Sequence, residues 1–307
     1  MTDYDSTDIR CNSRQQPSHG FRRWLWLPTL LFGDGLLLAV ILMAMIMLHR
    51  FGITKTEATL YTSLLCLPLV LRPLLETVVT YFRGTTKVWI LSAEFISALS
   101  LCALAFILPT GYWLQGTLCF LMFFVIAGVF GSIAVERFYL ADTSPDNLAG
   151  RSLPTLFRSL AILFGIGICA TLAGNMEVVT RNIRYSWSFV VYVMAGAEFF
   201  LWLWHSVFLP GGRRVPAGMK SLKGVRFTDF KVSFMLLLRE KKSRLTLVMF
   251  FLFVLPEAFL ALMAPLFMVD AAHNGGLGLA PQEFGLAFGT VGVMAFFVGK
   301  NLGLNAV

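Results

Sequence analysis

Charged residues are scarce in this sequence. Asp, Glu, Lys and Arg make up only 14% of its 307 residues, and apolar types make up 57%. An ordinary soluble domain is roughly one quarter charged. A soluble fold of this size would have to expose much of its apolar surface, so the composition excludes soluble and disordered proteins. It predicts an all-α polytopic membrane protein.

The residues and motifs of catalysis are also sparse. The chain has five cysteines, an odd number, and four histidines that are scattered along it. None has the spacing of a metal or redox site, and the sequence contains no phosphate-binding glycine loop and no nucleophile elbow. We therefore expect no metal, no cofactor and no enzymatic activity. A membrane enzyme is the weakest alternative, because it needs a polar cluster that only the fold could assemble.

Long apolar runs are what the sequence contains instead. About 20 apolar residues, rising about 1.5 Å each, cross a hydrocarbon core about 30 Å thick. Eight segments qualify, and they are continuous rather than alternating, which indicates helices rather than strands. The predicted spans are 27–48, 58–80, 88–108, 114–135, 157–173, 187–209, 245–268 and 283–304.

Lys and Arg are distributed unequally between the loops. With the N-terminus in the cytoplasm, 19 of them fall inside and 4 outside. Loops rich in Lys and Arg stay on the cytoplasmic side. We therefore expect a multi-pass protein of the cell inner (cytoplasmic) membrane with a cytoplasmic N-terminus. The net charge of +8 then reflects topology and not nucleic-acid binding.

The spans form two unequal groups around one long loop. We predict a cytoplasmic tail at 1–23, a six-helix bundle at 24–209, a basic cytoplasmic linker at 210–244 and a partial second bundle of two helices at 245–307. In the linker, segment 227–239 has the pattern of a helix that lies in the lipid headgroup plane. This order is the layout of the major facilitator superfamily, in which two six-helix halves rock around a central site.

Motifs over about residues 24–303 carry a closer resemblance. Asp34 and Gly35 in LPTLLFGDGLL match a family acid and glycine, and Pro68, Arg72 and Pro73 match a Leu-Pro pair followed by a basic residue and proline. Segments 137–142, 149–161, 185–193 and 256–270 continue the match in the same order. Together they resemble the AmpG-like branch of that superfamily, which includes muropeptide permeases and acetyl-coenzyme A transporters.

The resemblance implies a secondary active transporter with alternating access, coupled to protons. Its substrate would be a small solute such as an anhydro-muropeptide or a related sugar-peptide. The family has twelve spans, so a closed transport cavity would need further C-terminal helices or a partner. A permease for a different solute and a truncated, non-transporting membrane fragment remain alternatives.

The chain also departs from the family pattern at charged positions. Thr80 replaces an acid of the second span, and Leu262 replaces a lysine of the seventh. In the fourth span, Gly131 and Ser132 replace a His-Asp pair, which leaves Glu136 as the acid of that region. These departures weaken the implied substrate more than the implied fold.

Ionisable residues inside the spans are the candidate substrate and coupling sites. A charge at membrane depth costs roughly 2.5–3.5 kcal/mol on insertion scales, so it needs a partner or a wet cavity. Asp34, Arg72 and Glu94 lie at similar depths on the cytoplasmic side, and Glu76 follows Arg72 by one helical turn. We expect these four residues to form one network. It would fix helix packing, gate transport, or contact substrate or proton.

Two further acids lie nearer the midplane. Glu257 follows Pro256 on a helix that lines the cavity in resembling proteins, whereas Glu198 lies on a helix that is usually outside it. The resemblance therefore favours Glu257 over Glu198 as the proton carrier, and a hydrogen bond to a neighbouring helix is the alternative role of Glu257. The candidate set is Asp34, Arg72, Glu76, Glu94, Glu136 and Glu257.

Overall fold

Five helical stretches are long and apolar enough to cross a membrane in the computed structural model. The structure describes residues 19–72, 75–76, 79, 85–142, 148–211, 241–292, 295 and 298–299. Within these residues the chain is helical, with no strand. The five stretches are Trp24–Arg50, Thr86–Ile107, Trp113–Leu140, Pro154–Thr180 and Ile183–Phe208. The coarse prediction of an all-α polytopic membrane protein is confirmed.

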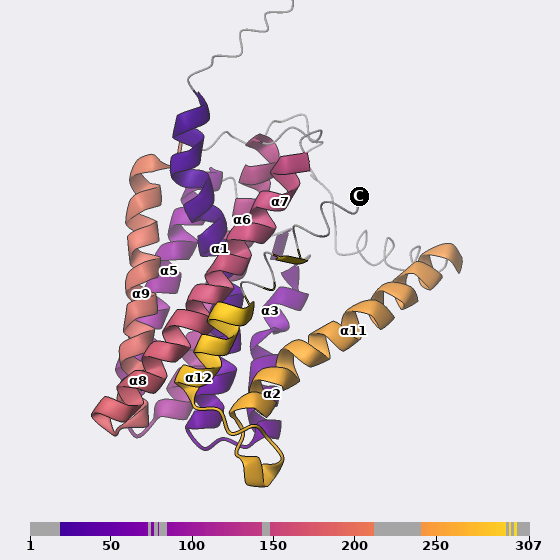
Figure 1. The fold of residues 1–307 in the computed structure, drawn as a ribbon. Helices are drawn as coiled ribbons and strands as arrows, with labels where there is room; N and C mark the ends of the chain where they lie inside the picture. The colour runs from indigo at the N-terminus through magenta and orange to yellow at the C-terminus, as the bar shows by residue number, and fades with distance from the viewer. Residues whose placement is uncertain are drawn as a thin grey trace, which may run out of the picture.

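The membrane-crossing stretches and the segment formed by α2 and α3 alternate in direction along the chain, and α2 with α3, and α7 with η1 and α8, each run in one direction (Figure 1). The bundle has two ends. The Trp24 end is the one at which α1 begins and α9 finishes, and the Arg50 end is the one at which α1 finishes. The elements are α1 (His19–Arg50), α2 (Lys55–Leu65), α3 (Leu67–Val70), α5 (Thr86–Ile107), α6 (Trp113–Asp142), α7 (Leu148–Ile162), η1 (Leu163–Cys169), α8 (Ala170–Thr180), α9 (Ile183–Phe208), α11 (Lys241–Val269), η2 (Ala272–Asn274), α12 (Pro281–Leu286) and η3 (Ala287–Gly292).

The second predicted span is interrupted. Thr54 and Glu57 form a capping box that starts α2, which ends at Leu65. A turn at Cys66 follows α2, and Pro68 lies two residues after Cys66. The proline ring nitrogen has no hydrogen to donate to a carbonyl oxygen of the preceding helical turn. The prediction of one continuous helix is therefore wrong for the described part of 58–80, because this proline interrupts the helix.

Other predicted boundaries also change. The helix α1 starts at His19, inside the predicted tail. The fifth span is longer than predicted, because α7, η1 and α8 follow one another without a break, with η1 wound as a π-helix. The seventh span is the 29-residue α11. The linker helix expected at 227–239 and the end of the eighth span lie outside the described residues.

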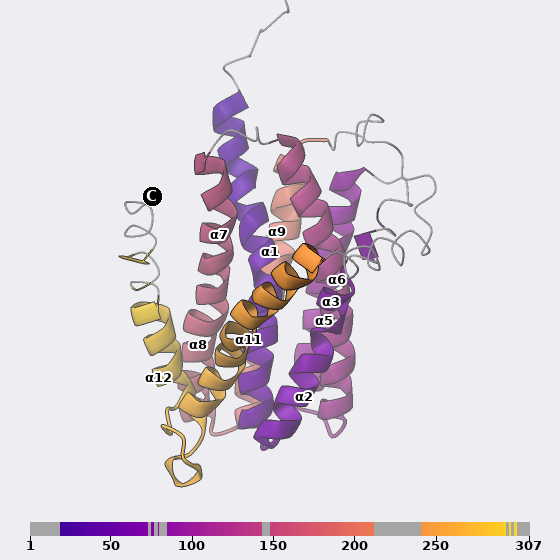
Figure 2. The same cartoon turned by 90° about the vertical axis from the view of Figure 1, so that its right-hand side faces the viewer.

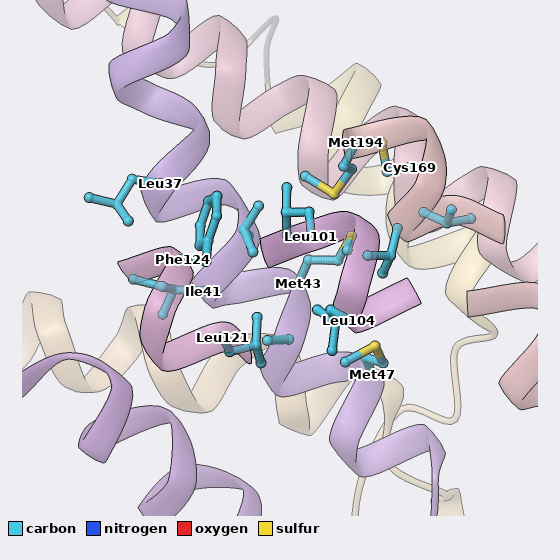
Figure 3. Packing of buried hydrophobic residues seen from close by; sticks show 14 of the residues in the cluster. Leu37, Ile41, Met43, Met47, Leu101, Leu104, Leu121, Phe124, Cys169 and Met194 are labelled. Atoms are coloured by element: carbon cyan, nitrogen blue, oxygen red, sulfur yellow. The ribbon is translucent and has the colours of Figure 1, made fainter. Parts of the chain in front are cut away.

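The helix α1 is the central element of the bundle. The most apolar 18-residue segment of α1 is 72% buried inside the protein, whereas the corresponding segments of the other four candidate spans are 39–50% buried. Figure 3 shows Met43 and Met47 of α1 among Leu104 of α5, Phe124 of α6 and other buried side chains. Lipid tails are as apolar as these residues, so close packing rather than water exclusion holds such helices together.

The helix α11 leaves the bundle at a slant (Figures 1 and 2). At its C-terminal end, Leu266 and Val269 are buried. Further toward Lys241, the apolar side chains that the structure describes are exposed: Leu245, Val248, Met249, Leu252, Leu255, Phe259 and Leu260. Among the side chains of α11 that the structure describes, the buried ones therefore lie at its Arg50 end.

Candidate functional site

An ion pair joins α1 to α7 inside the bundle. Arg158 Nε donates a hydrogen bond to Asp34 Oδ2 at 2.5 Å, and the Asp34 side chain is only 3% exposed. The neighbouring Gly35 makes this approach possible. A Cβ at Gly35 would lie 2.7 Å from both the Arg158 Cα and the Ala161 Cβ, so any larger residue would push α7 away.

A second polar chain crosses from α5 through α9 to α1. His205 on α9 is fully buried, and its Nδ1 lies 2.6 Å from Glu94 Oε1 on α5. Its other ring nitrogen, Nε2, lies 3.0 Å from Thr29 Oγ1 on α1. Thr29 in turn donates its hydroxyl hydrogen to the Trp26 carbonyl oxygen at 3.0 Å.

Lys87 fixes the relative position of α5 and α9. Its Nζ donates hydrogen bonds to the carbonyl oxygens of Ser206 (3.1 Å) and Leu209 (2.6 Å) at the end of α9. A cation there satisfies carbonyl groups that the helix leaves open and favours the negative end of the helix dipole. The contact therefore sets the register in which Glu94 meets His205.

A small cavity lies between these two pairs. It has a volume of about 30 Å³ and its lining includes the carboxyl residues Asp34, Glu94 and Glu198. Glu198 is 4% exposed and lies seven residues before His205, on the same face of α9. Asp34 Oδ1 and Glu94 Oε2 are buried and have no hydrogen-bond partner among the described residues.

The predicted network is paired differently in the structure. Arg72 forms an ion pair with Glu136 of α6. Glu76 accepts a hydrogen bond from Arg137, with Nη2 and Oε1 3.2 Å apart. The carboxyl groups of both pairs are about half exposed. A single network of Asp34, Arg72, Glu76 and Glu94 is therefore wrong: α6 supplies the partners of Arg72 and Glu76, because the kinked α2–α3 segment packs against it.

The preference for Glu257 as the midplane proton carrier stays a prediction, because the Glu257 side chain lies outside the described residues. Glu198, the other midplane acid, is buried at the cavity. Arg158 and His205 are not among the candidate residues that the sequence predicts. Two signals could have found them: Arg158 lies within an apolar stretch, and His205 follows Glu198 by two helical turns on one face.

A separate set of charged side chains joins the helices at the Arg50 end of the bundle. Glu177 of α8 accepts hydrogen bonds from Arg50 Nη2 at 2.5 Å and from Trp187 Nε1 at 2.7 Å. These contacts join α1, α8 and α9. Because both carboxylate oxygens of Glu177 have a donor, this pair reads as a structural clamp.

The loop after α11 is tied to the same end. Asp270 pairs with Lys55, and His49 Nε2 lies 3.5 Å from Asp270 Oδ1. The hydrogen bond from Lys55 holds the pKa of the Asp270 carboxyl below its ordinary value, although burial opposes this and a bond from Asn274 adds to it. A cavity of about 330 Å³ is lined by His49, Arg50 and Asp270 with loop residues 278–280.

The described residues contain no group of three His, Cys, Asp or Glu side chains placed to hold a metal ion. Comparisons of the chain with protein-family models, curated proteins and solved structures find no match. The class that the fold and the site define is therefore that of a polytopic α-helical membrane protein with buried carboxyl groups that pair with side chains of neighbouring helices.

Proposed function

We propose that this chain belongs to a secondary active transporter of the major facilitator superfamily, in its AmpG-like branch. It would move a small solute across the inner membrane by alternating access, coupled to protons. The solute class implied by the sequence resemblance is an anhydro-muropeptide or a related sugar-peptide. The N-terminus would face the cytoplasm, as the distribution of Lys and Arg favours.

The observation that carries this proposal is the polar interior of the Trp24 half. Asp34 with Arg158, Glu94 with His205, and Glu198 lie on α1, α5, α7 and α9 within or beside apolar helices. Asp34 is ten residues along the candidate span that starts at Trp24, about 15 Å at the helical rise. Ionisable groups at such depth are costly, and in membrane proteins they mark ion and substrate pathways.

The size of this cavity supports a role of its carboxyl groups in handling the ion rather than the solute. Sites for small organic molecules measure about 300–1,000 Å³, whereas this cavity measures about 30 Å³. It has room for a water molecule but not for a sugar-peptide. In the proposed transporter, the solute site lies where the bundle would face a second half.

The same small volume favours the second candidate, a membrane fragment that does not transport. A bundle without a solute-sized cavity among these carboxyl groups could still insert and bind a partner. The exposed apolar face of α11 offers a surface that such a partner could cover.

Transport assays in vesicles separate the two candidates. The full chain is reconstituted and a pH gradient is imposed, inside alkaline. Uptake of labelled anhydro-muropeptide, sugars and short peptides is then measured. We expect one solute to accumulate, and Asp34→Asn to lower its uptake at least tenfold. Glu57→Gln, at the exposed capping box that starts α2, serves as the matched control and keeps most of the uptake.

Failure of every solute to enter, with protein that is folded and correctly inserted, would contradict the transporter and support the fragment. Accumulation that is insensitive to the pH gradient would leave a transporter that is not coupled to protons. Cysteine labelling near residues 50–55 tests the orientation independently, because those residues should react from outside the cell.

A further inference from the structure

The hydrogen bonds of His205 determine where its protons lie. The Thr29 hydroxyl has one hydrogen, and it is directed to the Trp26 carbonyl oxygen. Thr29 Oγ1 therefore accepts from His205, so Nε2 carries a hydrogen. A neutral imidazole has only one N–H, which leaves Nδ1 as an acceptor unless the ring is charged.

The other side of the ring then requires one more proton. His205 Nδ1 and Glu94 Oε1 are 2.6 Å apart, which is a short hydrogen-bond distance. Two lone pairs cannot meet in this way, so a hydrogen lies between them. Either Glu94 is a carboxylic acid that donates to a neutral ring, or Glu94 is a carboxylate that accepts from an imidazolium. Both arrangements hold one proton more than a carboxylate beside a neutral histidine.

Glu198 has no described cation to balance a negative charge. The cavity lining contains Asp34 from α1 and Glu94 from α5, and α6 contributes no ionisable residue to it. From α7, Arg158 pairs with Asp34. His205 pairs with Glu94. A buried carboxylate without a counter-charge is costly, and binding of a proton removes that cost.

We infer that Glu94, His205 and Glu198 form a buried proton-binding site between α5 and α9, with one proton held in the Glu94–His205 contact and a second, exchangeable one on Glu198. Binding adds a proton to a Glu198 carboxylate oxygen as an O–H bond, and release returns it to water. The cavity beside Glu198 has room for the water that such an exchange requires. As the coupling site of a transporter it rests on the proposed function; as a proton site it does not.

The first test reads the His205 ring in the unaltered protein. The chain is labelled with ¹⁵N-histidine, reconstituted in lipid and measured by solid-state NMR at pH 7, with the His205 signals assigned by their loss in His205→Gln. We expect a protonated Nε2 and an Nδ1 in a strong hydrogen bond. A ring protonated only on Nδ1 would overturn the inference, because Glu94 would then need no extra proton.

The second test reads Glu198 by infrared spectroscopy. A protonated carboxyl group absorbs through its C=O stretch, separately from a carboxylate. We expect such a band at pH 7 in the wild-type protein, and in Glu198→Gln the loss of the component that belongs to Glu198. A component that remains in Glu198→Gln and is lost in Glu94→Gln places the proton of the Glu94–His205 contact on Glu94. Glu136→Gln, which alters an exposed carboxylate, should leave the band unchanged. A band that Glu198→Gln does not change, or its absence from the wild type, contradicts the assignment.

These outcomes are distinguishable from failure of the proposed function. If the band and the ring state are as expected but no solute is taken up, the proton site stands and the transporter does not. If uptake depends on the pH gradient but neither spectroscopic signal is found, the transporter stands and its coupling site lies elsewhere.

Discussion

The two ends of the bundle hold their charges in different ways. At the Arg50 end, Glu177 has a donor for each carboxylate oxygen, from Arg50 and Trp187. In the Trp24 half, Asp34 and Glu94 each keep one buried oxygen without a described partner, beside the same cavity. Both oxygens of the Glu177 carboxylate therefore have a donor, although the buried Arg50 Nε of the same pair has no described partner, whereas Asp34 and Glu94 each keep a free acceptor oxygen.

This difference distinguishes a contact that joins helices from a site that can bind a proton or a water molecule. A fully satisfied buried pair joins helices and has nothing left to offer a ligand. A buried acceptor without a partner carries a free-energy cost that a proton or water can relieve. The comparison is consistent with helix fastening by Glu177 at the Arg50 end and with the proton site proposed for the Trp24 half.

The largest expected effect comes from removal of Arg158. Arg158→Met leaves the buried Asp34 carboxylate without its cation, which should destabilise the protein by up to about 3 kcal/mol. Arg158→Met combined with Asp34→Leu removes both charges and should recover much of that loss. Thermal unfolding in detergent micelles compares both variants with the wild-type protein. A double variant as unstable as Arg158→Met would contradict a buried charge as the cause.

A smaller effect is expected where α1 and α7 approach each other. Gly35→Ala places a Cβ 2.7 Å from the Arg158 Cα and should destabilise the bundle by about 1–3 kcal/mol through overpacking. Gly196→Ala in α9 is the matched control, because a Cβ there meets no heavy atom within 4 Å. Equal thermal midpoints for the two variants would show that the close approach is unimportant.

The smallest effect is the pH dependence of the Arg50 end. The pKa of Asp270 is lowered in the folded state, so the unfolded chain binds its proton more readily. Its contribution to stability is present above the unfolded pKa of about 3.9 and is lost as pH falls through the lower folded pKa. We expect Lys55→Met to reduce the fall in thermal midpoint as the pH is lowered through this window.

Asp270→Asn supplies the control for that measurement. It should reduce the pH dependence as Lys55→Met does, and the double variant should add little. His49 lies near the same carboxyl group, so His49→Gln is compared to exclude a histidine origin. An unchanged pH profile in both Asp270→Asn and Lys55→Met would contradict the role of this pair.

The sequence by itself determined the class of protein and most of its long helices. Continuous apolar runs can satisfy their backbone hydrogen bonds in lipid only as helices, so length and composition were sufficient. The break at Pro68 was also readable in principle, because a missing N–H is a local property. Asp34, Glu94 and Glu198 were visible as costly charges for the same reason.

Only the tertiary structure decided which charges meet. Arg158 reaches Asp34 because Gly35 lets two helices touch, although the two charged residues are 124 positions apart in the chain. His205 meets Glu94 because Lys87 fixes α5 against the end of α9. Charge pairing depends on helix register and rotation at distances of a few ångströms, and a single sequence carries hydrophobic periodicity but no such distances.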